Sequence, residues 1–209
     1  MSQKLHTADD LKRVASAGGA ALYTNRLQVL IGSSTCGLAM GARAVEDAVV
    51  ATVKKFSGDA IVKRTGCIGF CSSEPLMDLV LPGGPRISYG NMTPQKARDI
   101  LTGYLTGGSV SAEEALGKFS GEEHVLTGEV HSYPEMEDAV KIPEWSGLDF
   151  FRRQKKVILR NCGMIDPMSI EESIARGSYR GALRALLSMK PEDVLDEMTA
   201  SGLRGRGGA

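Results

Sequence analysis

The sequence has no long apolar run, no net charge and few cysteines, and each of these features excludes a class of protein. No run approaches the roughly 20 apolar residues that a membrane-spanning helix needs. Residues 7–22 also lack the apolar core of a secretory signal, because Asp9, Asp10, Lys12 and Arg13 lie among them. We therefore expect a cytoplasmic protein with no membrane span. Because 25 basic side chains balance 25 acidic ones, no overall field favours nucleic acid as a partner.

The four cysteines are Cys36, Cys67, Cys71 and Cys162. In a cytoplasmic chain, four cysteines indicate metal ligands or redox groups rather than a disulfide framework. The sequence contains no C-x-x-C motif, which disfavours thiol exchange of the thioredoxin type. Zinc ligands usually come in closely spaced pairs, and this chain has only one such pair, which makes zinc a weaker alternative to an iron–sulfur cluster.

Three of these cysteines lie in two glycine-rich stretches, S-T-C-G-L-A-M-G-A and T-G-C-I-G-F-C, each at an expected junction of strand and loop. An iron–sulfur cluster or a zinc ion needs soft thiolate ligands grouped in this way. Glycines allow backbone N–H groups to approach a bulky inorganic core. The glycines concerned are Gly32, Gly37, Gly66 and Gly69.

Hydrophobic periodicity around these stretches predicts a mixed sheet covered by helices. Alternating residues 26–31 and apolar residues 60–62 predict strands, and residues 38–56 between them predict one helix of about five turns. Residues 76–81 and 86–89 flank P-G-G-P and predict a hairpin. Two further helices are predicted, one capped by Thr7 and one opened by Thr93-Pro94 and stopped by Gly107-Gly108. The expected class is α/β, in the manner of a thioredoxin-like fold.

The charge distribution suggests a division of the chain. Residues 109–155 hold 5 basic and 10 acidic side chains without a sustained period, and we expect an acidic linker there. The expected divisions are an N-terminal helix, a thioredoxin-like domain, this linker and a small, mainly helical segment, at residues 1–25, 26–108, 109–155 and 156–209.

The C-terminal segment is predicted to contain a short strand and three helices. Residues 156–159 predict the strand, and Ser169 with Glu172 forms a capping box for a helix that ends near Gly177. Ser178 is expected to cap the next helix. Pro191 opens a third helix, which Gly202 closes.

Several motifs in order resemble a known family. Residues 27–108 resemble the thioredoxin-like [2Fe-2S] ferredoxin domain, and more closely the version found at the N-terminus of the NADH-binding flavoprotein subunit of complex I-like enzymes and bifurcating hydrogenases. Residues 157–167 and 201–209 resemble the entry into the flavin domain of that subunit. The motifs are T-C-G-L-A-M-G-A, G-C-I-G-F-C, L-P-G-G-P-R, Y-G-N-M-T-P, V-I-L-R-N-C-G-M-I-D-P and S-G-L-R-G-R-G-G-A.

The resemblance implies a [2Fe-2S] cluster held by Cys36, Cys67 and Cys71. The family has four ligands, as C-x4-C followed by C-x3-C, and its first cysteine falls on Ile31 here, which cannot bind iron. Cys162 is the one remaining cysteine and is expected as the fourth ligand if residues 156–165 dock on the cluster face. A degenerate site, or a packed thiol at Cys162, remains an alternative.

The glycine-rich C-terminal stretch is the other candidate site. Its amides and positive charge suit phosphate, although a frayed tail has the same composition. By resemblance it is the first half of a loop that binds FMN, while the remaining residues for FMN and NADH belong to a longer parent chain. The candidate residues are Arg204, Gly205, Arg206, Gly207 and Gly208.

These observations predict an electron-transfer protein that is part of an NAD(P)-linked multi-subunit oxidoreductase and is not catalytically complete on its own. The resemblance implies two partners, a small thioredoxin-like iron–sulfur subunit and a catalytic subunit of the same complex. The alternative is a docking module that has lost its cluster, suggested by Ile31. A thiol-redox enzyme is a third interpretation.

Overall fold

The computed structural model describes residues 5–56, 58–126, 128–205 and 207. Its α-helices are α1 (Ala8–Leu22), α2 (Thr35–Ala39), α3 (Ala42–Lys55), α4 (Pro94–Gly107), α5 (Ile170–Ala175), α6 (Arg180–Ser188) and α7 (Pro191–Ala200). Its strands are β1 (Leu27–Gly32), β2 (Ala60–Thr65), β3 (Met77–Val80), β4 (Arg86–Tyr89), β5 (Ala115–Phe119), β6 (Gly121–Glu123) and β7 (Val130–Ser132). Short 3₁₀ turns are η1 (Cys71–Ser73), η2 (Ala112–Glu114), η3 (Glu137–Ala139) and η4 (Trp145–Gly147).

The main sheet has the strand order β2-β1-β3-β4-β5. Strands β1 and β2 are parallel, and the other neighbours are antiparallel. Strands β6 and β7 form a separate antiparallel hairpin. The mixed sheet with covering helices confirms the expected α/β class, and the hairpin β3–β4 around P-G-G-P is also confirmed.

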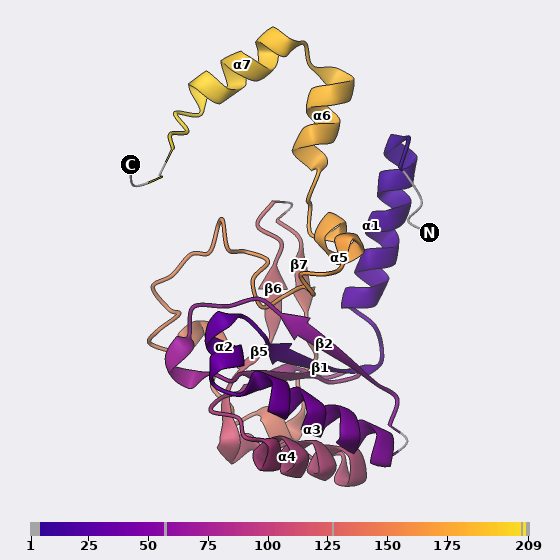
Figure 1. Cartoon of the computed structure of the whole chain (residues 1–209), viewed down its shortest axis with the longest axis vertical. Helices are drawn as coiled ribbons and strands as arrows, with labels where there is room; N and C mark the ends of the chain where they lie inside the picture. Colours follow the sequence, from indigo (N-terminus) through magenta and orange to yellow (C-terminus); the bar gives the residue numbers. More distant parts are fainter. Residues whose placement is uncertain (1–4, 57, 127, 206, 208–209) are drawn as a thin grey trace.

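Helices α3 and α4 cover one face of the sheet with apolar side chains (Figure 1). Because side chains alternate along a strand, the residues of β1, β3 and β4 that face these helices follow every second position. They form one contiguous core, which includes Val29, Ile31, Met77, Leu79, Ile87, Tyr89, Val45, Val49 and Leu101. Burial of this face accounts for the stability of the sheet domain.

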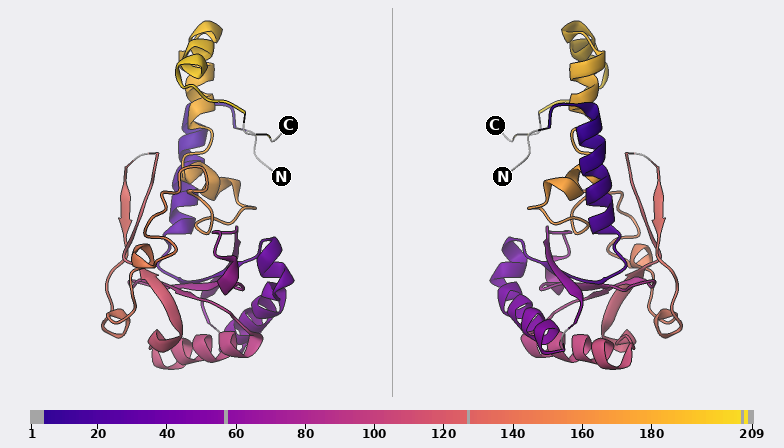
Figure 2. Two further views of the ribbon diagram at one scale, coloured as in Figure 1. Left: turned by 90° about the vertical axis from the view of Figure 1, so that its left-hand side faces the viewer. Right: turned by 90° about the vertical axis from the view of Figure 1, so that its right-hand side faces the viewer.

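Helices α1 and α5 and the β6–β7 hairpin lie on the opposite side of the sheet (Figure 2). The strand residues that face them include Gln28, Lys63, Asp78 and Arg86, and each has a polar partner. Strand β1 is therefore buried at all six positions instead of alternating, because both faces are covered. The predicted strand is confirmed, because Leu27, Val29 and Ile31 all belong to the apolar core on one face.

Caps and glycines explain most helix boundaries. Thr7 and Thr93 accept the predicted backbone hydrogen bonds at the starts of α1 and α4. The single helix predicted for residues 38–56 is wrong, because Gly41 adopts φ +99° between α2 and α3. Gly18 in α1 allows close packing of two helices, because a Cβ there would clash with the carbonyl oxygen of Glu171 in α5.

The segment 109–155 is more than a linker, which corrects the prediction. Residues 115–119 form β5 and pair with β4, while β6 and β7 form their own hairpin. Two C-terminal predictions are also wrong. Residues 156–159 form turns and irregular chain instead of a strand, and α6 starts after Tyr179 without a side-chain cap from Ser178. Ser169 does cap α5 as predicted.

Helices α6 and α7 extend away from the sheet, and none of their residues is buried (Figures 1 and 2). Leu186 and Leu195 are 83% and 68% exposed. Of the helices in the described part of the chain, none combines the length and the hydropathy required to cross a membrane.

Candidate iron–sulfur site

Three cysteines lie at one edge of the sheet. Cys36 lies in α2, after β1, and Cys67 follows β2. Because β1 and β2 are parallel, their carboxyl ends and the loops that follow meet at the same edge. Cys71 begins the turn η1, which leads to β3. The fold thus places the two predicted cysteine loops next to one another.

The Cys71 thiol lies beside the thiols of both Cys36 and Cys67. A hydrogen bond with Cys36 is the largest influence that raises the pKa of Cys71 to about 11, and the charges of Cys36 and Cys67 add to it. Cys36 and Cys71 are exposed, whereas Cys67 is half-buried. The structure therefore brings together three thiols that are separated by up to 35 positions in the sequence.

The arrangement differs from a site for a single ion. Among the residues described, no three His, Cys, Asp or Glu side chains have the spacing required to hold one metal ion. A [2Fe-2S] cluster distributes four thiolates over two iron atoms, so its ligands need not converge on one point.

The glycines around the thiols have two different roles. Gly69 adopts φ +89° and donates its N–H to Sγ of Cys67 at 3.2 Å, as expected for an amide that stabilises thiolate charge. Gly32 and Gly37 are needed for close packing: a Cβ on Gly37 would clash with the carbonyl oxygen of Gly32, and a Cβ on either glycine would lie 3.1 Å from Oε2 of Glu74. The approach of all four glycines to a cluster stays a prediction.

Glu74 is a buried carboxyl group below the Cys36 turn that the sequence did not reveal. Its residue is 2% exposed, and Oε2 accepts the N–H of Leu76 at 3.0 Å. Burial raises the pKa of the Glu74 carboxyl, and the nearby charge of Asp78 adds to the shift.

Ile31 stands where the family that the sequence resembles has its first cysteine. It is 0% exposed and belongs to the core between β1 and the helices. Its side chain therefore packs the domain. A fourth cysteine ligand from another part of the chain stays a prediction.

The loop that contains Cys162 contacts the Cys67–Cys71 loop. Gly163 has φ +79°, and a Cβ there would clash with Cγ2 of Ile68. Lys156 donates from Nζ to the carbonyl oxygen of Ile68 at 3.1 Å. The two ends of segment 156–163 thus both contact Ile68, which lies next to Cys67.

Lys156 is a cation next to two of the thiols. Burial lowers the pKa of this lysine, whereas interaction with Cys162 and Cys67 opposes the shift. Its Nζ lies 5.0 Å from the centroid of the Phe151 ring. Cys162 therefore lies on the same side of the domain as Cys67, although its role as a ligand stays a prediction.

Arg86 fixes the residues that follow Cys162. Its guanidinium donates from Nη2 to the carbonyl oxygen of Gly163 at 2.5 Å and from Nη1 to Sδ of Met164 at 3.0 Å. Asp78 accepts from Nε at 2.9 Å and also from Nη2. Burial acts to lower the pKa of Arg86, but Asp78 and Glu122 outweigh it and raise that pKa above its ordinary value.

An aromatic cluster joins the cysteine loop to the segment predicted as a linker. Phe70 stacks on Phe150, with ring centroids 4.8 Å apart, and meets Trp145 edge-on at 6.2 Å. Trp145 in turn stacks on Phe119 and Phe151 at 5.2 and 4.5 Å. The cluster anchors residues 145–151 beside the thiols.

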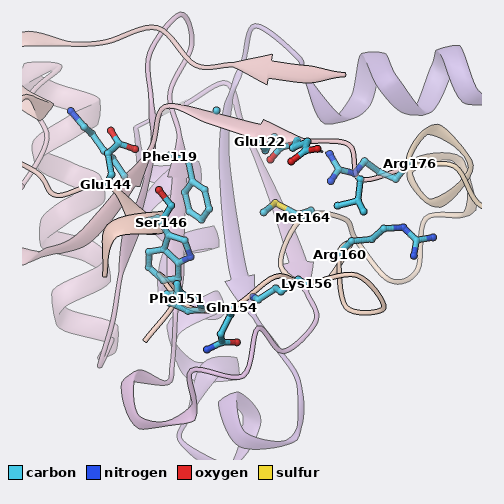
Figure 3. Close-up of a pocket in the computed structure, with 15 residues that line it drawn as sticks. Phe119, Glu122, Glu144, Ser146, Phe151, Gln154, Lys156, Arg160, Met164 and Arg176 are labelled. Carbon is cyan, nitrogen blue, oxygen red and sulfur yellow. Dashed lines mark hydrogen bonds and ion pairs between the residues drawn. The ribbon is translucent and has the colours of Figure 1, made fainter. Parts of the chain in front are cut away.

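A cavity of about 290 Å³ lies next to this cluster (Figure 3). Phe119 and Phe151 line one side, and Lys156, Met164 and Arg176 line the other. Arg176 is paired with Glu122 at 2.9 Å, and Lys156 is bonded to Ile68. The cations of the cavity are thus largely engaged by the protein itself.

The glycine-rich C-terminal residues are not assembled into a site within the described part of the chain. Arg204, Gly205 and Gly207 are exposed beyond α7. Arg206 and Gly208 lie outside the described residues. A role of these five residues with FMN stays a prediction.

Sequence reasoning missed Arg86, Lys156 and Phe70 as parts of the site. Arg86 ends the L-P-G-G-P-R turn motif and Lys156 belongs to a basic run, and neither pattern predicts a position beside the cysteines. Phe70 lies inside the cysteine motif itself, and an aromatic residue between two cysteines was the available signal.

Comparisons with known proteins find partial relatives. A 58-residue stretch, 28% of this chain, is 50% identical to the NADP-reducing hydrogenase subunit HndC of Solidesulfovibrio fructosivorans and covers 12% of that protein. Another match, 26% identical over 76 residues, covers 36% of this chain and 60% of subunit HndB from the same organism. The [2Fe-2S] ferredoxin of Clostridium pasteurianum is 33% identical over 57 residues, 27% of this chain and 53% of that protein.

The chain thus spans less than two thirds of the length of each of these relatives. No family model matches it. Among solved structures, the thioredoxin-like [2Fe-2S] ferredoxin of Aquifex aeolicus is similar with a TM-score of 0.38 and 20% identity, over 44% of this chain and 92% of that one. This last likeness is too low to support an inference about function.

Proposed function

We propose that this chain binds a [2Fe-2S] cluster and transfers electrons within a hydrogenase-type, NAD(P)-linked multi-subunit oxidoreductase. The observation that carries the proposal is the meeting of the thiols of Cys36, Cys67 and Cys71 from two loops at one sheet edge. Cys162 would complete the ligand set, since its loop contacts the same cysteine loop. Similarity to hydrogenase subunits and to a [2Fe-2S] ferredoxin supports the same conclusion.

When bound, the cluster would supply one-electron transfer. The protein would hold it through thiolates and donate the Gly69 N–H toward the Cys67 sulfur. The aromatic cluster of Phe70, Trp145 and Phe151 would exclude water from one side of the site. Lys156 would place a positive charge near two ligands. These features set the charge and solvent access that tune a reduction potential.

The wider assignment rests on the same similarities. In this proposal the chain is the N-terminal region of the flavoprotein subunit, and FMN and NADH are held mainly by a longer parent protein. Its partners would be a small thioredoxin-like iron–sulfur subunit and a catalytic subunit. The match to HndC, 50% identical over 58 residues, supports a place in a hydrogenase-type complex.

Iron and acid-labile sulfide analysis tests the proposal. Protein purified and reconstituted without oxygen should contain both elements in equal amounts, and Cys67→Ala should lose most of them. Ser72→Ala, an exposed residue beside Cys71, is the matched control and should retain them. Absence of both elements from the reconstituted wild-type protein would contradict the proposal.

A docking module without a cluster is the second candidate, and the burial of Ile31 favours it. It predicts that Cys67→Ala leaves both subunit assembly and electron transfer unchanged. Assembly by pull-down and electron transfer to a viologen dye, measured on the same preparations, separate the two candidates.

A further inference from the structure

We propose that Arg86 is a positioning residue that holds the Cys162 turn against the Cys67–Cys71 loop. This inference rests on the proposed function, because it assigns Arg86 the task of bringing the fourth ligand to the site. Arg86 is 77 positions from Gly163 in sequence, yet its guanidinium donates to the carbonyl oxygen of that residue. A second donor of the same group reaches Met164.

The guanidinium is itself held rigidly. Its side chain is 4% exposed, and Asp78 on the neighbouring strand accepts from both Nε and Nη2. Its carbon Cζ lies 4.7 Å from the centroid of the Phe119 ring on the other neighbouring strand. Arg86 therefore projects from β4, between β3 and β5, with a fixed orientation, which is what an anchor for a distant turn requires.

The geometry of an arginine suits this task and that of a lysine does not. The planar fork can donate to Asp78, Gly163 and Met164 at once, whereas an ammonium lacks this fixed fan of donors. A buried guanidinium without acceptors would also be costly. The carbonyl oxygen of Gly163 therefore provides an acceptor for the buried guanidinium, and the guanidinium holds the turn in place.

The turn has a second anchor that fixes its approach to the site. Lys156 bonds the Ile68 carbonyl oxygen, and Gly163 packs on the Ile68 side chain. Cys162 lies directly before the residue that Arg86 holds. Release of Gly163 would free the end of the segment that carries the thiol while the Lys156 end stays attached.

Alkylation of Cys162 in cluster-free protein tests the position of the turn directly. The key variant is Arg86→Gln combined with Asp78→Asn, which avoids leaving a buried carboxylate unpaired. Mass spectrometry after timed iodoacetamide treatment should show Cys162 modified about tenfold faster than in the wild-type protein, as expected for loss of a hydrogen bond to a charged group.

Three comparisons make this result specific. Asp78→Asn alone keeps the bond from Arg86 to Gly163 and should leave the alkylation rate nearly unchanged. Lys118→Gln removes another buried cation, which lies on β5 and on the face of the sheet opposite Arg86. This substitution should also leave the alkylation rate of Cys162 unchanged. Arg86→Lys should give a partial increase, and it serves as the main variant if the double variant fails to fold. An unchanged Cys162 rate in a folded Arg86 variant would overturn the proposal.

A double-mutant cycle in reconstituted protein separates positioning from general stability. Loss of Arg86 should change the midpoint potential of the cluster when Cys162 is present and cause no further change in a Cys162→Ser background. An equal shift in both backgrounds would show that Arg86 does not act through Cys162. If no variant, including wild type, binds iron, the proposed function fails, and the alkylation result alone decides the position of the turn.

Discussion

The two faces of the main sheet are closed by different kinds of contact. Toward α3 and α4, the strands present apolar side chains such as Val29, Leu79 and Ile87. Toward α1, α5 and the β6–β7 hairpin, they present polar groups such as Lys63 and Arg86, each with a specific partner. Hydrophobic contact is non-directional, whereas a buried hydrogen-bonded charge accepts only one geometry.

This difference separates stability from positioning. The apolar face stabilises the domain that carries Cys36, Cys67 and Cys71, and many similar side chains could fulfil that role. The polar face determines where the C-terminal segment lies. Through Arg86, it places the turn that carries Cys162 on the cysteine loop.

The largest effect is expected from a cavity on the apolar face. Leu79→Ala should lower the free energy of unfolding by about 3–5 kcal/mol, because Leu79 is 0% exposed in the centre of the sheet. Chemical denaturation followed by circular dichroism measures the change. Leu186→Ala on exposed α6 is the control and should alter stability by less than about 0.5 kcal/mol. Equal losses of unfolding free energy from the two substitutions would contradict the stabilising role of the apolar face.

A smaller and more local effect is expected on the polar face. Lys63 pairs with Glu172 at 2.6 Å, and Glu172 is 3% exposed. Lys63→Met leaves that carboxylate buried without its cation, which should cost about 3 kcal/mol in the docking of α5. Hydrogen exchange should show loss of protection in α1 and α5, with α3 and α4 unchanged. Addition of Glu172→Met should restore much of the protection. A uniform loss of protection across the whole sheet would contradict the view that the apolar face stabilises the domain and the polar face positions the C-terminal segment.

Next in size is the electrostatic effect of Lys156 on the cluster. Lys156→Met should lower the midpoint potential, because a nearby positive charge favours the reduced form. An interaction of roughly 1 kcal/mol corresponds to about 40 mV for a one-electron couple. Redox titration monitored by electron paramagnetic resonance measures the shift. Lys155→Met, at the exposed neighbouring position, should leave the potential nearly unchanged, and identical shifts would exclude a specific role for Lys156.

The smallest effect is expected from pH at the β6–β7 hairpin. Burial lowers the pKa of both His124 and His131; the charge of Arg176 adds to this shift, and the charge of Glu122 opposes it without reversing it. The neutral forms are therefore favoured in the folded state, so stability is present above the ordinary histidine pKa of 6.5 and declines as pH falls below it.

Thermal unfolding between pH 7.5 and 5.5 would reveal this dependence. His131 stacks on Tyr23 at 3.8 Å, so His131→Phe keeps an aromatic contact without a titrating group. The variant should show a flatter pH profile than the wild-type protein. A profile of unchanged slope would rule out a contribution from His131.

Much of the sheet domain could be predicted from local signals. Thr93-Pro94 and the P-G-G-P turn mark boundaries that depend on only a few neighbouring residues, and the structure contains both. Strand β5 could not be predicted in this way, because Ala115–Phe119 has no alternation and forms through pairing with β4. The break at Gly41 was also missed, since apolar spacing continues across it.

The candidate site also has one part that local motifs predict and another that depends on long-range contacts. The clustering of Cys36, Cys67 and Cys71 could be predicted, because their spacing and glycine context are local motifs. The anchor at Arg86 could not, since its partner Gly163 is remote in sequence and its burial depends on the whole polar face. Long-range pairing between a charge and a backbone carbonyl leaves no periodic trace in a sequence.

The electron paramagnetic resonance spectrum of the reduced, reconstituted protein tests the central claim most directly, by comparison of wild type with Cys162→Ser. If the polar face brings Cys162 to the other three thiols as a ligand, the substitution should change the g values or abolish the signal. A Cys162→Ser spectrum identical to that of wild type, with full iron content, would contradict the account.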